Sequence, residues 1–453
     1  MPRYQLSASS YRLLLNYMKH LNASYSPGVA QRTIRFATVI TPGVSPERKQ
    51  VFLQMMQAAL VQKNGSTVVR NGGRRHMATA AEMILGTENK WALDVWELKG
   101  PPESWEQQLQ DFYRRSPPFA LLSGLSETTW KPIEDFCERE RLPSWFPSVL
   151  QAPVREDQPV YSLYFSKGLT LEADVLGAHF APQPAAHRVV QVYRASESAA
   201  PAVEQLSSAL WAKGQRRSIA VDLDRLVPGD AVDQLAALSS MPDTRVVAWL
   251  GANDLARYAP ALAAAAPGTT YLSAGLLHAH TAAIPLELRY QVRMVYPYEI
   301  PGLRKAGTDY MPVWLRLKQI ALVDEPMQSE VFFALNFMSD TLAVMLDNLY
   351  RDYLLERADT DIGQREARKA EDQLRDQNFV RLHFHQTPMV GNIPLGYRTS
   401  SFTENADLST TIYPRLVLGT NQRYASKGAY ITNIRKGADG IDRIERVGDW
   451  VMP

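Results

Sequence analysis

Between Thr33 and Gly275 the chain repeats one unit, in which a short apolar strand leads through a turn into an amphipathic helix. The predicted strands are Thr33–Ile40, Trp91–Leu98, Phe119–Leu125, Arg188–Arg194, Ser218–Leu223, Arg245–Leu250 and Thr269–Ser273. Strands that alternate with helices in this way predict parallel sheets covered by helices on both faces. In such sheets the carboxyl ends of the strands form the crevice where ligands bind. We therefore expect an α/β protein that binds a small molecule at its strand ends.

Composition excludes several classes of function. The chain has 453 residues, enough for two or three domains, and its net charge of +2 gives no general attraction to nucleic acid or to an anionic membrane. Cys137 is the only cysteine, which excludes an internal disulfide framework and a cysteine metal cage. Because no stretch of about eighteen apolar residues occurs, we predict no membrane-spanning helix. We also expect no export signal in the sequence as it stands.

The strand ends carry few reactive groups, and we predict binding without catalysis, a cofactor or a metal. No nucleophile elbow, phosphate loop or metal-ligand cluster follows the predicted strands. Asp222 and Asp224 lie on one alternating strand, so they do not establish a convergent carboxyl pair. Two histidine pairs each lack the third ligand that a metal site needs. These pairs are His278 with His280 and His383 with His385.

The order of the predicted elements divides the chain into two lobes. Residues 31–152 and about 297–405 form the first predicted lobe, and residues 153–296 and about 406–453 form the second. The polar segment Gln151–Pro159 and the segment Tyr296–Ile300 are the predicted crossovers, and hence the hinges of a two-lobed closure. Further predicted elements are strands at Trp145–Val149, Val160–Phe165, Leu288–Tyr296, Tyr413–Leu418 and Gly428–Ile434, and helices at Leu169–Phe180 and Pro326–Glu356.

Residues 1–30 contain one amphipathic helix, which needs a partner to cover its apolar stripe. Met1-Pro2, Leu6-Ser7 and Tyr17–Leu21 are similar to the final segment of a class I c-type cytochrome, where a Met-Pro pair supplies the axial sulfur. The motif Cys-x-x-Cys-His is absent, so we expect no haem in this chain. The resemblance implies an upstream cytochrome domain in a longer natural product and a c-type cytochrome as partner. The alternative is a helix that docks on the nearest lobe.

A second resemblance spans most of the chain, from about Thr33 to Pro453. The segments that carry it are Phe119–Leu125, Phe136–Pro147, Tyr164–Ala173, Tyr413–Gly419 and Ala425–Tyr430. They resemble the type I periplasmic solute-binding proteins, the branched-chain-amino-acid-receptor-like group that feeds ABC importers. This resemblance implies two doubly wound parallel-sheet lobes with a ligand cleft between them, a periplasmic location, and a permease or sensor as partner. The competing hypothesis is the ligand-binding half of a cytochrome c fusion that serves periplasmic electron transfer or substrate oxidation.

The resemblance also implies which loops hold the ligand. Ser126, Glu127 and Thr128 match the loop that usually offers hydroxyl groups to an amino-acid carboxylate, and Ser148 and Leu150 match the second carboxylate-binding turn. Glu127 and Leu150 stand where small hydroxyl residues are usual. A carboxylate at Glu127 would repel an anionic ligand group and favour a cationic ligand or a polyol.

Four further residues complete the predicted site. Asn253 lies where the family commonly stacks an aromatic ring on the ligand, and Ser273 and Ala274 lie where an acidic residue commonly holds the ammonium group. Phe165 is a candidate for the cleft wall. The missing aromatic and acidic residues argue against an α-amino acid as the ligand.

Overall fold

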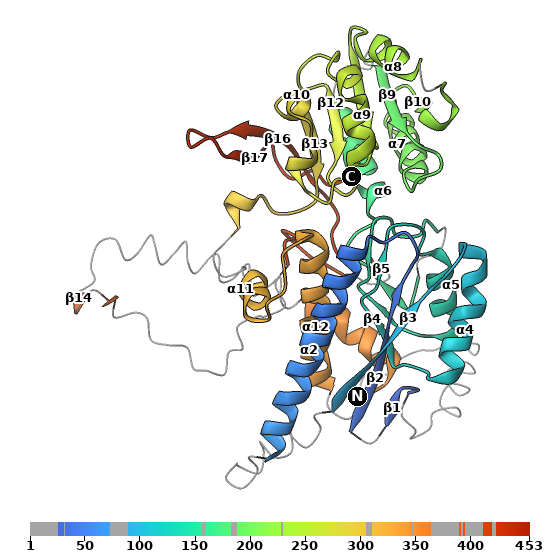
Figure 1. The fold of residues 1–453 in the computed structure, drawn as a ribbon, viewed down its shortest axis with the longest axis vertical. Helices are drawn as coiled ribbons and strands as arrows, with labels where there is room; N and C mark the ends of the chain where they lie inside the picture. Colours follow the sequence, from blue (N-terminus) through green and yellow to red (C-terminus); the bar gives the residue numbers. More distant parts are fainter. Residues whose placement is uncertain are drawn as a thin grey trace, which may run out of the picture.

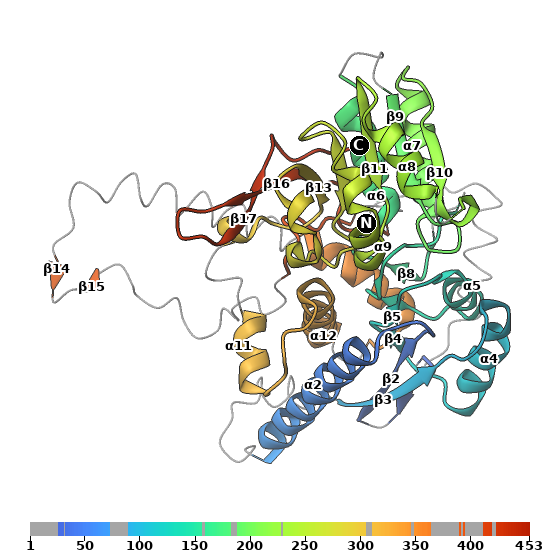
Figure 2. The same ribbon diagram turned by 45° about the horizontal axis from the view of Figure 1, so that its top comes forward.

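The computed structural model describes residues 26–30, 32–72, 89–155, 159–182, 188–227, 230–304, 310–345, 348–363, 389–390, 393–394, 411–418 and 423–453. These residues form two α/β lobes, each built around one sheet (Figures 1 and 2). The first lobe holds the blue, teal and orange elements of Figure 1, and the second holds the green and yellow elements with the red hairpin. The predicted fold class of two parallel-sheet α/β lobes is confirmed.

The first sheet has the strand order β7-β5-β2-β4-β6-β8, and β1 and β3 also pair with β2. Only the pairing of β1 with β2 is antiparallel among these described strands. The elements of this lobe include β1 (Val29–Ala30), β2 (Thr33–Ile40), α2 (Pro46–Gly72), β3 (Lys90–Glu97), α4 (Trp105–Arg115), β4 (Ala120–Leu122), β5 (Leu125–Ser126), α5 (Lys131–Glu140), β6 (Ser144–Trp145), β7 (Ser148–Val149), β8 (Ser162–Leu163), α11 (Tyr310–Leu317) and α12 (Glu325–Met345).

Helices cover both faces of the first sheet because successive side chains of a strand point to opposite faces. Phe36 and Ile40 of β2 belong to the apolar core shared with α2 and α12. The alternate residues Ala37 and Val39 belong to a second core, shared with α4 and α5. In both views α2 and α12 run side by side on one face of the sheet, with α4 and α5 on the other (Figures 1 and 2).

The second sheet has the order β10-β9-β11-β12-β13-β16-β17, in which β9 to β13 are parallel and β16 and β17 are antiparallel. Helices α6 and α7 share an apolar core on one face, and α8 and α9 share another core on the opposite face. The elements of this lobe are α6 (Leu169–Phe180), β9 (Arg188–Tyr193), α7 (Ala200–Ala212), β10 (Ile219–Asp222), α8 (Ala231–Ser239), β11 (Thr244–Ala248), α9 (Ala252–Leu262), β12 (Thr270–Ser273), α10 (Leu286–Arg289), β13 (Val292–Tyr296), β16 (Tyr430–Lys436) and β17 (Asp442–Arg446).

Two neighbouring bends interrupt the strands of the first sheet near their carboxyl ends. Ser123, Gly124 and Phe146 have φ angles of 56°, 151° and 49°, outside the range of extended strands. The bends divide the predicted strand Phe119–Leu125 into β4 and β5, and the predicted strand Trp145–Val149 into β6 and β7. Because β4 pairs with β6 and β5 with β7, both bends occur at the same level of the sheet.

The chain passes between the lobes three times, at residues 164–169, 297–300 and 425–429, between elements of different sheets. The first and third passages are hydrogen-bonded to each other, since Ala425 N donates to Tyr164 O at 3.0 Å and Ser426 N to Phe165 O at 2.6 Å. The described segments therefore form a bonded connector between the lobes.

The predicted crossover at Gln151–Pro159 is wrong, whereas the predicted segment Tyr296–Ile300 does contain a passage. The chain returns after residue 159 to form β8, which pairs with β6 of the first sheet, so it leaves the first lobe only at about residue 165. The predicted boundary after residue 152 is therefore too early. In the same way, residues 412–418 pack in the core of the first lobe, which moves the last boundary from about 406 to about 425.

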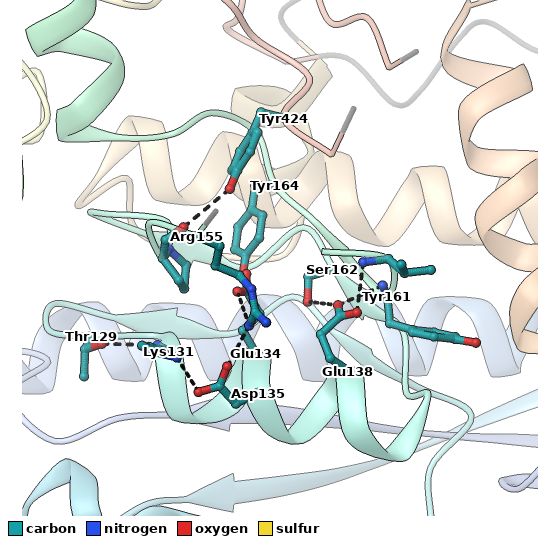
Figure 3. A network of polar contacts seen from close by, with 12 residues as sticks. Thr129, Lys131, Glu134, Asp135, Glu138, Arg155, Tyr161, Ser162, Tyr164 and Tyr424 are labelled. Carbon is teal, nitrogen blue, oxygen red and sulfur yellow. Dashed lines mark hydrogen bonds and ion pairs between the residues drawn. The ribbon is translucent and has the colours of Figure 1, made fainter. Parts of the chain in front are cut away.

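A polar network ties the β8 segment to α5 (Figure 3). Tyr164 Oη donates to Glu134 Oε2 at 2.5 Å, and Arg155 Nη1 donates to Glu134 Oε1 at 3.2 Å and to Asp135 Oδ1 at 2.6 Å. The Glu134 side chain is fully buried. Burial raises its pKa, and the bonds from Tyr164 and Arg155 act in the opposite direction. The network fixes the start of the first interlobe passage, because Tyr164 is the first residue of that passage.

Three other predictions of secondary structure need correction. The predicted helix Pro326–Glu356 is α12 followed by a separate helical stretch at 351–363, where the Arg351 guanidinium bonds to the carbonyls of Pro118 and Phe119 and so turns the chain toward the sheet. The predicted strand Leu288–Tyr296 is α10 followed by β13, and the described residues 411–418 form no strand. The predicted helix within residues 1–25, with its cytochrome resemblance, lies outside the described residues, as do His383 and His385.

Candidate ligand site between the lobes

The candidate site is a pocket where the two lobes and the interlobe passages meet, with about 560 Å³ of space between atoms, open solvent included. From the first lobe it is lined by Arg48, Ser126, Glu127, Ser148, Val149, Leu150, Asp324, Pro326, Met327, Glu330 and Tyr413, from the second by Glu172, Gly275 and His278, and from the passages by Ser166, Gly168, Pro297 and Tyr298.

Four predicted residues line this pocket: Ser126, Glu127, Ser148 and Leu150. Ser126 and Glu127 lie at the end of β5, and Ser148 and Leu150 lie in and directly after β7. The two strands pair with each other after the bends, which brings their carboxyl ends together. The Ser126 hydroxyl is held in place, because it accepts a hydrogen bond from Thr41 Oγ1 at 2.9 Å. The sequence therefore located the contribution of the first sheet to the pocket.

The other five predicted residues do not line the pocket. Thr128 is exposed on the loop after β5, and Asn253 is exposed in the first turn of α9. Phe165 is buried behind the wall, where its ring stacks on Tyr413 with centroids 5.5 Å apart. Ser273 and Ala274 are buried, and the adjacent Gly275 reaches the pocket in their place. The family resemblance thus placed Ser273 two residues from Gly275, which lines the pocket, whereas no described residue near Asn253 does so.

The sequence reasoning missed the charged residues of the pocket. Arg48, near the start of α2, forms an ion pair with Glu127, and its Nε donates to Asp324 Oδ2 at 2.8 Å. Asp324 Oδ1 accepts the N–H of Met327 at 3.0 Å, so the same carboxylate caps the start of α12. The negative charge of Glu127 is therefore compensated within the protein. This compensation weakens the predicted repulsion between Glu127 and an anionic ligand group.

Glu172 reaches the pocket from the first turn of α6, directly after the first passage. Its side chain is buried, and its Oε1 accepts the N–H of Gly275 at 2.9 Å. Its Oε2 is buried without a hydrogen-bond partner among the described residues. Burial raises the pKa of Glu172 to about 8, against smaller lowering effects of Ser273 and Gly275. At neutral pH this carboxyl group is thus largely protonated.

Glu330 faces the pocket from α12 and has a similar environment. Tyr413 Oη donates to its Oε1 at 2.6 Å. Burial raises the pKa of Glu330 to about 7, and hydrogen bonds from Ser148 and Tyr413 counteract this effect in part. Burial also raises the pKa of Tyr298 well above its usual value, and the carboxyl groups of Glu330, Glu172 and Asp324 act in the same direction. Tyr298 therefore lies within the field of acidic groups from both lobes.

Two polar contacts join the lobes directly at the pocket. Ser198 Oγ, in the loop before α7, donates to the carbonyl oxygen of Glu127 at 2.9 Å. His278 Nδ1 lies 3.5 Å from Asp324 Oδ2. Residues His278 and Ala279 have left-handed φ angles of 48° and 56°, so the loop that presents His278 is held in a conformation that side chains disfavour. The structure is therefore that of two lobes in contact around the pocket.

The remaining candidate groups have structural partners outside the pocket. Asp222 Oδ1 accepts the N–H of Asp224, and Asp224 forms an ion pair with Arg194 at 2.7 Å. Cys137 is buried in the α4–α5 core, and burial raises the pKa of its thiol well above the usual value. Within the described residues no group of three or more histidine, cysteine, aspartate or glutamate side chains could hold a metal ion. None of the described helices is both long and apolar enough to span a membrane.

Comparison with solved structures identifies the fold. The chain resembles a type 1 periplasmic binding protein from Bordetella pertussis Tohama I with a TM-score of 0.58 and 13% identity, over 92% of this chain and all of the other. It resembles a branched-chain amino acid ABC transporter protein from Thermus thermophilus with bound valine (TM-score 0.59, 8% identity, 94% of this chain and 98% of the other). It also resembles an ABC transporter solute-binding protein from R. palustris in complex with benzoate (TM-score 0.58, 10% identity, 94% and 97%).

No protein-family model and no curated protein sequence matches this chain. The fold is the two-lobed fold of type I periplasmic binding proteins, as the sequence resemblance implied. At these identities the similarity concerns the fold, and the function must be argued from the pocket itself.

Proposed function

We propose that this chain is a solute-binding receptor that closes around one small polar ligand between its lobes. The observation that carries the proposal is the pocket itself, which is lined by both lobes and by the passages at residues 164–169 and 297–300. A ligand that contacts both lobes binds the closed arrangement better than the open one and so shifts the population toward closure. The contacts of Ser198 and His278 across the pocket mouth support such a closure.

The proposed receptor releases its ligand unchanged. The Ser126 hydroxyl is hydrogen-bonded to Thr41, and the Ser148 hydroxyl is hydrogen-bonded to the Glu330 carboxyl group. These bonds fix the two hydroxyl groups in position, as suits groups that bind a ligand. A serine nucleophile needs an adjacent base that is itself oriented by a third group. We propose an ABC-type permease or a sensor as the partner that reads the closed state, and the periplasm as the location, by analogy of fold with the solute-binding proteins above.

A thermal-shift screen of the purified chain tests the proposal. The screen uses amines, polyols, amino acids and aromatic acids, and each hit is followed by small-angle X-ray scattering and by recovery of the bound compound. We expect at least one class to raise Tm and to reduce the radius of gyration, because ligand binding stabilises the closed state. Recovery of a chemically altered compound, or a complete lack of stabilisation by every class, would refute the proposed function.

A further inference from the structure

The pocket holds more acidic groups than cationic ones. Four carboxyl side chains line it, and Arg48 is the only arginine or lysine among its lining residues in the described part of the chain. Arg48 already pairs with two of these four, Glu127 and Asp324. Its charge is therefore used within the protein and leaves no cation for an anionic ligand group. The other two carboxyl groups, Glu172 and Glu330, form no ion pair with a basic side chain among the described residues, and they come from different lobes.

Glu172 is the acidic group with unused bonding capacity. Its side chain is 2% exposed and lines the pocket, yet its Oε2 has no hydrogen-bond partner among the described residues. A buried polar oxygen without a partner costs about 1–3 kcal/mol, and more when it is charged, so such an oxygen in a native pocket calls for an explanation. A donor supplied by a ligand would satisfy it. Gly275 beside it has no side chain that would fill this space.

We propose that the ligand carries a cationic amino group and that Glu172 of the second lobe is the carboxylate that binds it. This assignment rests on the receptor function proposed above and names the chemical class of its solute. Glu330 of the first lobe lies on the same pocket wall as Tyr298 and Tyr413 and adds negative potential from the opposite side. An amine held between Glu172 and Glu330 would bridge the two lobes, so the recognition of the cation and the closure of the lobes are one event.

A cation is favoured over a neutral or anionic solute for electrostatic reasons. An amino group donates hydrogen bonds and carries the charge that an acidic, partly buried pocket lacks. A carboxylate ligand would have to compete with Glu127 and Asp324 for Arg48. A hydroxyl group could donate to Glu172 Oε2 but would bring no positive charge to stabilise the ionised form of this carboxyl group. Of the amine, the carboxylate and the hydroxyl group, only the amine supplies both a hydrogen-bond donor and a positive charge.

Matched probe compounds test the proposal. The probes are butylamine, 4-amino-1-butanol and 1,4-diaminobutane, with 1-butanol and 1,4-butanediol as neutral equivalents and butyrate and succinate as anionic equivalents. Their binding is measured by thermal shift and by titration calorimetry on the full chain. We expect at least one amine to raise Tm while its neutral and anionic equivalents do not. Glu172→Gln, which keeps the acceptor for Gly275, should weaken amine binding about thirtyfold or more, and the exposed surface variant Glu103→Gln should bind like the parent.

A proton measurement provides a readout that a purely structural role of Glu172 would not move. Because burial raises the pKa of Glu172 to about 8, an amine that binds its carboxylate at pH 7 must displace a proton. Calorimetry in phosphate and in Tris should reveal the release of about one proton with the parent chain and clearly less with Glu172→Gln. The charged and titratable groups that share the pocket with Glu172 are Arg48, Glu127, His278, Tyr298, Asp324, Glu330 and Tyr413.

The outcomes separate this proposal from the receptor function. If neutral or anionic probes, or other solutes of the screen, bind while every amine fails, the amine assignment is overturned and the receptor function stands. The same holds if amines bind equally well to the parent and to Glu172→Gln. If no solute of any class binds to the folded parent chain, both proposals fall. If the parent chain binds an amine and releases a proton, and Glu172→Gln loses both the binding and the proton release, the amine assignment and the receptor function are both supported.

Discussion

The His278 imidazole of the second lobe lies 3.5 Å from the Asp324 carboxylate of the first lobe. Burial lowers the pKa of His278 to about 4, and the Arg48 charge acts in the same direction, so the ring is neutral at pH 7. The same oxygen of Asp324 accepts the stronger, charged bond from Arg48 within the first lobe. The first lobe is thus fastened by an ion pair, whereas the lobes meet through a weak neutral contact that can open.

We predict that the double variant His278→Ala with Ser198→Ala opens the lobes without unfolding them. It removes both polar contacts across the pocket mouth, each worth about 0.5–1.5 kcal/mol. The ligand-free radius of gyration in small-angle scattering should increase, while Tm changes little because both side chains lie outside the cores. The exposed Ser208→Ala on α7 serves as control. An unchanged radius of gyration in the double variant would show that other contacts set the lobe arrangement.

We predict that Gly168→Ala strongly destabilises the first interlobe passage. Gly168 has a φ angle of +65°, and a Cβ atom there would lie 2.2 Å from the carbonyl oxygen of Leu150. Gly214→Ala is the matched control, since Gly214 has a φ of +74° but no heavy atom within 4 Å of the added Cβ. The control should cost about 1 kcal/mol for the backbone conformation alone. Denaturant unfolding should show a clearly larger loss for Gly168→Ala, and equal losses would contradict the steric argument.

The sequence predicted the lobes well because their elements follow from local periodicity. The helix Leu169–Phe180 and the strand Thr33–Ile40 have the predicted bounds. The bends at Ser123 and Phe146 could not be predicted, because nothing in these side chains favours a left-handed backbone. The return of the chain to form β8 was missed for a related reason. A polar, proline-bearing loop marks an exposed connection but does not say which sheet the next strand joins.

Part of the candidate site followed from the family resemblance, and the rest could not be predicted from the sequence. Ser126, which ends β5, and Ser148, which begins β7, were predicted from the resemblance of their loops to the carboxylate-binding loops of solute-binding proteins, and both line the pocket. Arg48 and Asp324 are 276 positions apart and lie at the starts of two helices, so only the packing of α2 beside α12 brings them together. Glu172 gave a weak signal, as one of two acidic residues, with Asp174, in the apolar stretch of α6. A charged residue in an apolar helix is a candidate functional residue, because charged side chains are rarely buried without a partner.

We predict that Tyr164→Phe lowers the free energy of unfolding by about 1–3 kcal/mol. The variant leaves Glu134 Oε2 without its buried donor in the network of Figure 3, while the ring still packs on Tyr424. Tyr290→Phe is the matched control, because its hydroxyl donates to Asp442 at the surface at 2.8 Å and is replaced by water. Denaturant unfolding of the two variants gives the comparison. A cost for Tyr290→Phe as large as that for Tyr164→Phe would mean that burial of Glu134 is not what makes its hydrogen bond important.

We predict that the ligand-free chain becomes less stable as the pH rises from about 5 to 9, and that Glu172→Gln reduces this loss. The pKa of Glu172 is about 8 in the folded chain and near the ordinary glutamate value of 4.5 when the chain is unfolded. Its protonated form therefore stabilises the fold fully below pH 4.5, and this contribution disappears as the pH passes through about 8. At about 1.4 kcal/mol for each unit of pKa difference, the effect amounts to a few kcal/mol.

Unfolding of the parent, of Glu172→Gln and of Glu103→Gln at pH 5, 7 and 9 measures this dependence. Glu330, with a pKa raised to about 7, contributes a smaller loss of stability with rising pH. The free energy of unfolding of the double variant Glu172→Gln with Glu330→Gln should therefore depend least on pH. Glu103→Gln should follow the parent at every pH. Parallel profiles for the parent and for Glu172→Gln would mean that Glu172 is solvated in the free protein, as it would be if the lobes open widely without ligand. In that case the proton release expected on amine binding would also be small, because the free carboxyl group would already be ionised at pH 7.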